Sequence, residues 1–121
     1  MTDIVQEAEN FVKEKLRRQD KKGFWKIDLS TSQIRKFLSA VNQIENKVVA
    51  EEDVLSGEIT NEIKYLKIIL AYQAGRTSSV KPLYTELIPR IDKIGNDKKK
   101  FVEFSRYVEA IVAYHKFYGG N

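Results

Sequence analysis

The spacing of apolar residues predicts helices along most of the chain. Apolar side chains recur every three or four residues, which places them on one face of an α-helix. The clearest run lies in residues 97–118, where Phe101, Phe104, Val108 and Ile111 share a face, and other runs begin near residues 4, 31, 59 and 80. No segment alternates apolar and polar residues long enough to require a sheet. The pattern therefore predicts an all-α protein, a compact bundle of about five helices, with residues 1–121 forming one domain.

Capping residues predict where some of these helices begin and end. Ser30 followed by Gln33 has the spacing of a capping box and is expected to begin the second helix. Asp97 is expected to begin the last helix, and the glycines at residues 119–120 are expected to end it. These signals are local, so they fix helix ends without specifying how the helices pack.

The segment around the third and fourth helices contains breaking residues. Gly75 is expected to end the third helix by turning the chain in the left-handed region, which would project Arg76 from a defined corner. Ser78 or Ser79 is then expected to cap the fourth helix. Because proline lacks a backbone N–H, Pro89 predicts a kink or break within that fourth helix.

Two stretches are apolar on more than one side. YLKIILAYQAGR (residues 65–76) and YVEAIVAYHKFYGG (107–120) share a Tyr-x3-Ile-x-Ala-Tyr pattern, and a helix apolar on two faces must be covered on both. Either these helices form the middle of the bundle, or one face meets another subunit. The tyrosines of these stretches are accordingly assigned to the core or to subunit contacts: Tyr65, Tyr72, Tyr107 and Tyr114.

Charge is distributed unevenly along the chain. The formal net charge is +4, and residues 13–26 contain seven lysines and arginines against two acidic residues. A basic N-terminal arm of about residues 1–28 would suit an anionic partner, although a solvated helix face has the same composition. With no cysteine, disulfides and thiolate metal sites are excluded. No apolar signal region or membrane-spanning stretch is present, so a cytoplasmic location and no membrane partner are expected.

The sequence offers few parts for catalysis. His115 is the single histidine, and it lies on an aromatic helix face where a packed ring is expected. The acidic residues 51–53 lack the spaced oxygen ligands and the glycine of a calcium loop, so an acidic turn is expected there instead of the centre of a metal-dependent nuclease. No phosphate-binding glycine loop occurs. A protein without enzymatic activity, cofactor or metal is therefore predicted.

Cations are instead concentrated near expected helix starts. A helix N-terminus carries partial positive charge, so lysine and arginine there are unfavourable unless an anion completes the site. Arg35 and Lys36 follow the Ser30 cap, Lys81 follows residues 78–79, and residues 98–100 are all lysine. These cations predict a phosphate-binding track, with exposed solubilising lysines as the alternative for residues 98–100.

Several segments resemble the small subunit of the type III-A CRISPR effector, the Csm complex. They occur in the family's order and cover about residues 29–120, so the basic arm lies outside the resemblance. The segments are LSTSQIRKFL (29–38), YLKIILAYQAGR (65–76), VKPLY (80–84), IDKIG (91–95) and FSRYVEAIVAYHKFYGG (104–120).

The resemblance implies a non-catalytic helical bundle present in several copies. Such subunits stack along a filament of repeated backbone subunits, together with a large subunit, and help to hold the duplex of guide and target RNA. Carried onto this sequence, the expected RNA-phosphate contacts are Arg35, Lys36, Lys64, Lys67, Arg76, Lys81, Arg106 and Lys116. The alternative from the residues alone is a helical protein–protein adaptor whose basic residues contact an acidic partner without binding RNA.

Overall fold

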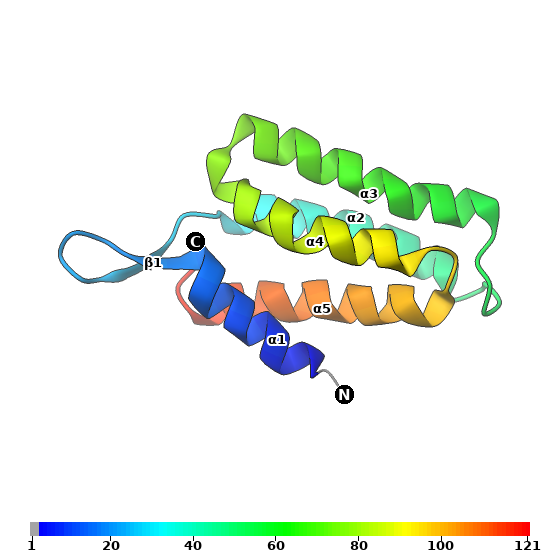
Figure 1. Ribbon diagram of the computed structural model, residues 1–121, viewed down its shortest axis with the longest axis horizontal. Helices are drawn as coiled ribbons and strands as arrows, with labels where there is room; N and C mark the ends of the chain where they lie inside the picture. The colour runs from blue at the N-terminus through cyan, green and yellow to red at the C-terminus, as the bar shows by residue number, and fades with distance from the viewer. Residues whose placement is uncertain (1–2) are drawn as a thin grey trace.

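The computed structural model describes residues 3–121, and within them the chain forms a bundle of five α-helices with one small hairpin (Figure 1). The predicted all-α fold is confirmed, apart from that hairpin. The elements are α1 (Ile4–Phe11), a π-helical turn η1 (Val12–Leu16), β1 (Arg17–Gln19), β2 (Trp25–Ile27), α2 (Thr31–Val48), α3 (Gly57–Arg76), a 3₁₀ turn η2 (Ser78–Val80), α4 (Lys81–Ile94) and α5 (Lys98–Phe117).

Helices α2 to α5 run alternately up and down the bundle (Figure 1). Helix α5 packs against α1, α2 and α4, whereas α3 packs against α2 and α4 at the opposite edge. As a result, the beginnings of α2 and α4 lie at the same end of the bundle as the end of α3. The hairpin projects from that end as well.

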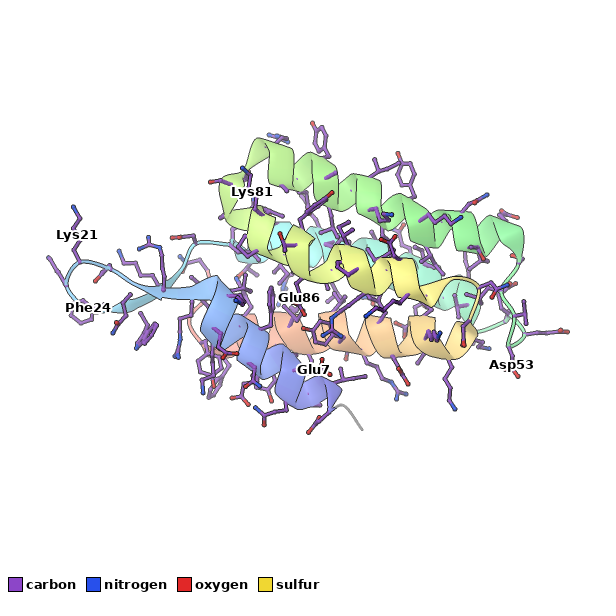
Figure 2. The ribbon with its side chains drawn as sticks, in the orientation of Figure 1. Glu7, Lys21, Phe24, Asp53, Lys81 and Glu86 are labelled. Atoms are coloured by element: carbon purple, nitrogen blue, oxygen red, sulfur yellow. The ribbon has the colours of Figure 1, made fainter. Side chains whose placement is uncertain are left out.

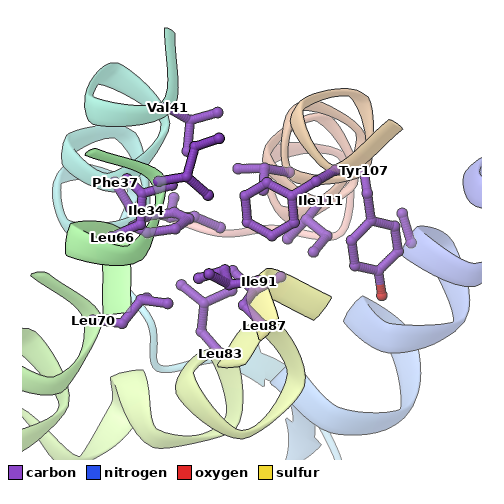
Figure 3. Close-up of a cluster of buried hydrophobic side chains, with 14 of the residues drawn as sticks. Ile34, Phe37, Val41, Leu66, Leu70, Leu83, Leu87, Ile91, Tyr107 and Ile111 are labelled. Carbon is purple, nitrogen blue, oxygen red and sulfur yellow. The ribbon is translucent and has the colours of Figure 1, made fainter. Parts of the chain in front are cut away.

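The core is formed by the apolar faces that the helical spacing predicted. Phe37 of α2, Leu70 of α3, Leu87 of α4 and Ile111 of α5 are all fully buried and converge between the helices (Figure 3). Burial of such side chains contributes about 1.5–3 kcal/mol each relative to leaving them exposed. The core therefore holds together helices that come from distant parts of the sequence.

The predicted caps of α2 and α5 are confirmed. Ser30 Oγ accepts from the Gln33 amide at 3.2 Å, and the Gln33 side chain accepts from the Ser30 amide, which completes the capping box. Asp97 caps α5 by accepting from the Lys100 amide at 3.2 Å. After α5, Gly119 adopts a positive φ of 100°, a conformation that glycine adopts without strain.

Three expectations for the α3–α4 region are wrong. Gly75 lies inside the last turn of α3 and is absent from the positive-φ glycines of residues 3–121, so Arg76 ends the helix as a helical residue. Ser78 belongs to the 3₁₀ turn, and Val80, without a side-chain hydrogen bond, precedes α4 in place of a serine cap. The break expected as one outcome at Pro89 does not occur, because α4 continues to Ile94 and the buried Leu87 and Ile91 on either side hold the helix to the core.

Helices α3 and α5, which are both apolar on two faces, differ in how those faces are covered. Helix α5 lies in the middle of the bundle, and its Tyr107 is 1% exposed. Helix α3 lies at the edge, and its Tyr65, Ile68 and Tyr72 are each more than half exposed. Within the described chain, no element covers this outer face of α3.

Candidate nucleic-acid interface

A groove of about 520 Å³ lies between α2 and α3 and contains Lys36 and Arg76. Arg76 ends α3, where a cation is favourable beside the negative end of the helix dipole, and Lys36 lies near the start of α2. No lining residue is acidic, so the groove presents uncompensated positive charge. Its lining residues are Gln33, Lys36, Tyr65, Ile68, Ile69, Tyr72, Gln73, Arg76 and Thr77.

The antiparallel packing of α2 and α3 positions these side chains. Gln73 Nε2 of α3 donates a hydrogen bond to the Gln33 carbonyl of α2 at 3.3 Å, which ties the two helices together at the base of the groove. One turn before Arg76, the exposed Tyr72 ring lies 5.7 Å from the guanidinium carbon. This cation–π contact restrains the arginine without neutralising its charge.

Two candidate cations of α3 point to a different side of the helix. Lys67 forms an ion pair with Asp92 of α4 at 2.5 Å, and Lys64 lines a smaller recess of about 240 Å³ between α3 and α4. Neither contributes to the α2–α3 groove. Because Asp92 already neutralises Lys67, that lysine is a weaker candidate for phosphate contact than Lys36 or Arg76.

The remaining candidates are divided between the two sides of the bundle. Arg35 is exposed beside Lys36, and Lys81 is exposed at the start of α4, close to where α3 ends (Figure 2). Arg106 and Lys116 are exposed on α5, which lies across the bundle from α3 (Figure 1). The structure therefore brings Arg35, Lys36, Arg76 and Lys81 to one end. Lys116 lies near the same end, because α5 finishes there, but like Arg106 it belongs to the helix across the bundle from α3.

The predicted track of cations at helix starts is only partly present. Helices α2 and α4 begin at the same end, but α5 begins at the other end of the bundle (Figure 1). There, Lys98 Nζ donates to the Glu51 carbonyl at 2.7 Å and to the Val49 carbonyl at 3.4 Å, just after the end of α2. Lys98 thus satisfies carbonyls that follow a helix C-terminus, which explains its position without a bound anion.

The sequence did not predict the hairpin or its exposed aromatic residues. Phe24 and Trp25 are 66% and 53% exposed at its tip, and Arg17, Arg18, Lys21, Lys22 and Lys26 are the cations of the same segment. The dense charge and the interruption of the helical pattern at Gly23 were the available signals. Strands of three residues are too short to give a clear alternation.

His115 is packed in the core as expected. Its ring is 1% exposed and its Nε2 lies 2.6 Å from the Leu29 carbonyl, which satisfies that nitrogen. Among residues 3–121, no group of three or more His, Cys, Asp or Glu side chains is arranged to bind a metal ion. Over the same residues, every helix is too short or too polar to cross a lipid bilayer.

The fold and groove together define a class: a small helical bundle with a cationic surface groove. Comparison with known proteins is more specific, because the family model Csm2 Type III-A matches residues 1–121. The chain belongs to this family, so the resemblance to the small subunit of the type III-A CRISPR complex is confirmed.

Relatives from several bacteria agree with the family assignment. A Streptococcus thermophilus protein, CRISPR system Cms protein Csm2, is 36% identical over 121 residues, which cover 98% of this chain and 93% of the relative. The Enterococcus italicus protein of the same name is 34% identical over 120 residues, covering 92% and 86%. The Mycobacterium tuberculosis protein is 30% identical over 100 residues, covering 80% and 78%.

Proposed function

We propose that this small subunit is a non-catalytic, cytoplasmic scaffold that binds the target RNA strand through its phosphates. The α2–α3 groove binds the backbone of the strand within the guide–target duplex, with Lys36 and Arg76 as the principal contacts. Arg35 and Lys81 extend this cationic surface at the same end of the bundle. Contacts to phosphates carry no base information, so binding is largely independent of sequence.

The observation that carries this proposal is the pairing of Lys36 and Arg76 in one groove without a carboxylate. Lys47 and Lys67, by contrast, are paired with Glu62 and Asp92. An unneutralised pair fixed on two helices has a defined spacing and does not have to give up an ion pair when it binds a phosphate.

The outer face of α3 supports stacking within a larger assembly. Tyr65 and Ile68 form an exposed apolar wall of the groove, and such surfaces favour contact with another protein. The partners in our proposal are the repeated backbone subunit, the large subunit and further copies of this subunit along the filament. In this arrangement the groove would bind RNA at its basic end and protein along its apolar wall.

RNA binding measured at several salt concentrations tests the proposal. The full chain is titrated with a mixed-sequence RNA duplex, and log affinity is plotted against log salt concentration. Each phosphate contact contributes a slope of roughly 0.7 to 0.9, so Lys36→Ala with Arg76→Ala should make the slope shallower by roughly 1.4 to 1.8. Scrambling the RNA sequence should leave the affinity nearly unchanged.

A matched pair of lysines provides the control. Lys13→Ala with Lys99→Ala removes the same charge from exposed positions outside the groove, and should change the slope by much less. Equal slopes for both double variants would contradict the groove as the binding site. If the wild-type chain bound no RNA but still entered the complex, the subunit would act as a protein–protein adaptor instead.

A further inference from the structure

The β1–β2 hairpin projects away from the bundle and exposes two aromatic rings (Figures 1 and 2). Phe24 is 66% exposed and Trp25 is 53% exposed. Neither ring belongs to the buried core, so the stability of the bundle does not account for them. Large exposed apolar groups gathered on one projection are typical of a binding site.

The tip of the hairpin is held in a defined shape by Asp20. Its Oδ1 accepts from the Lys22 and Phe24 amides at 2.9 and 3.0 Å, and its backbone N–H donates to the Phe24 carbonyl at 2.8 Å. Gly23 supplies the positive φ of 85° that the turn requires. The amide of Phe24 and then that of Lys22 favour the charged carboxylate and lower the pKa of Asp20. The carboxylate is therefore charged at neutral pH, the form that accepts these hydrogen bonds from the turn.

Trp25 is oriented by a cation–π stack. The Arg17 guanidinium carbon lies 4.1 Å from the Trp25 ring centre and 5.0 Å from the centre of the Tyr118 ring. The arginine thus links the hairpin to the turn that follows α5 and supports one face of the indole. A ring held in this way loses little conformational freedom when a ligand stacks on it.

Arg18 and Lys26 on the strands of the hairpin are paired with carboxylates, whereas the two lysines at its tip have no such partner within residues 3–121. Arg18 forms a bidentate pair with Asp28 at 2.6 and 3.0 Å, and Lys26 lies 3.5 Å from Asp20. Among the described residues, no carboxylate lies within ion-pair distance of Lys21 or Lys22. Lys21 points outward from the tip (Figure 2).

We propose that the hairpin tip binds single-stranded nucleic acid, with Phe24 and Trp25 stacking on bases and Lys21 and Lys22 contacting phosphates. This site is separate from the α2–α3 groove, and it extends the proposed function from backbone contact to base stacking. Aromatic side chains beside unpaired cations are the combination used by proteins that bind single strands without sequence preference. The hairpin also lies at the bundle end that carries Lys36, Arg76 and Lys81, so one strand could reach both sites.

The position of the chain's single tryptophan makes the test direct. Base stacking on Trp25 should quench its fluorescence, so the full chain is titrated with a twelve-nucleotide oligo(U), with oligo(dT), and with an RNA duplex. Quenching by the single strands and not by the duplex supports the proposal. Quenching by poly-glutamate, or by anionic lipid vesicles, as strong as that by oligo(U) would overturn it.

Variants of Phe24 test its part in the stacking. Phe24→Ala should weaken oligo(U) binding roughly five- to a hundredfold, because one stacked base contributes on that order. Phe24→Leu retains apolar surface without a flat ring and should weaken binding nearly as much. Tyr84→Ala removes a ring from a surface of α4 outside both sites and should have little effect.

The groove and hairpin proposals can fail independently. Lys36→Ala with Arg76→Ala should reduce duplex binding while retaining the quenching by oligo(U). Oligo(U) binding by the hairpin variants is measured by filter binding, because Trp25→Ala removes the fluorophore. If the Lys36 and Arg76 pair weakens duplex binding but neither Phe24→Ala nor Trp25→Ala affects oligo(U) binding, the groove stands and the hairpin proposal is wrong. Lys21→Ala with Lys22→Ala should reduce the salt dependence of oligo(U) binding, and an unchanged dependence would contradict their role.

Discussion

Gly120 lies directly against the buried ring of His115, and this contact leaves no room for a side chain. A Cβ at residue 120 would overlap the ring atoms Cε1, Nδ1 and Nε2. The ring cannot move aside easily, because it is 1% exposed and its Nε2 lies 2.6 Å from the Leu29 carbonyl. The Gly120 amide also donates to the His115 carbonyl at 2.8 Å, which fixes the backbone over the ring.

Gly120→Ala should therefore lower the free energy of unfolding by about 1–3 kcal/mol, the usual cost of overpacking. Urea unfolding followed by circular dichroism measures the change. Gly75→Ala is the matched control, because residue 75 is helical and nothing lies within 4 Å of its added Cβ. Gly75→Ala should raise the free energy of unfolding by about 0.5–1 kcal/mol. A large decrease instead would show that helix propensity and open space around the added Cβ do not decide the effect of a glycine substitution.

At the scale of the element, α4 shows how packing overrides a local signal. Pro89 cannot donate a backbone hydrogen bond, yet Leu87 and Ile91 beside it are buried and the helix continues to Ile94. The cost of the proline remains within the folded state, because an interior proline is about 3 kcal/mol less favourable than alanine. Pro89 itself is exposed, so its replacement leaves no cavity.

We expect Pro89→Ala to raise the free energy of unfolding by about 1–2 kcal/mol, since the restored hydrogen bond outweighs the added freedom of the unfolded chain. Thermal and urea unfolding measure the gain. Pro82→Ala provides a comparison, because Pro82 lies in the first turn of α4, where the missing N–H is not needed. If Pro82→Ala raised the free energy of unfolding as much as Pro89→Ala does, the interior position of Pro89 would not be the cause of its gain.

For the molecule as a whole, a polar cluster joins α1, α4 and α5 beside the apolar core. Arg90 Nη2 pairs with Glu7 at 2.8 Å, Arg90 Nε pairs with Glu86 at 3.1 Å, and the Tyr107 hydroxyl donates to Glu86 at 2.5 Å. The Arg90 guanidinium carbon also lies 3.8 Å from the centre of the Tyr107 ring. Burial, and then the hydrogen bond to Glu86, raise the pKa of Tyr107 far above its usual value.

This raised pKa predicts a loss of stability at alkaline pH. Below about pH 10 the folded and unfolded states both hold the Tyr107 proton, so its contribution is fully present. Above that pH the unfolded chain releases the proton and the folded chain retains it, so stability falls as pH rises. Tyr107→Phe should make the decline shallower between pH 9.5 and about 11, as measured by urea unfolding.

The difference between Tyr107→Phe and the wild-type chain isolates the contribution of this one residue. Tyr65→Phe is the control, because Tyr65 is 57% exposed and forms no hydrogen bond through its hydroxyl among the described residues. If Tyr65→Phe and Tyr107→Phe changed the pH dependence of the unfolding free energy equally, the burial of Tyr107 and its hydrogen bond to Glu86 would not be the source of that dependence.

The features that the sequence predicted well depend on local interactions. Helical spacing places Ile34 and Phe37 on one face, and the capping box at Ser30 involves only residues three positions apart. The cationic groove could not be located in the same way, because Lys36 and Arg76 meet only when α2 packs on α3. The hydrogen bonds of Lys98 could not be predicted either, because the carbonyl groups that it satisfies come from a turn that is distant in the sequence.

The base of the hairpin lies against the residues that follow α5, and this contact has a practical consequence for fusion proteins. The Thr31 amide at the start of α2 donates to the Asn121 carbonyl, and Tyr118 stacks on Arg17 beneath Trp25. An affinity tag or fluorophore appended after residue 121 would therefore emerge beside both proposed contacts with RNA and could obstruct them. Helix α1 begins under α5, away from the projecting strands, so labels attached before it should leave binding unaffected (Figure 1).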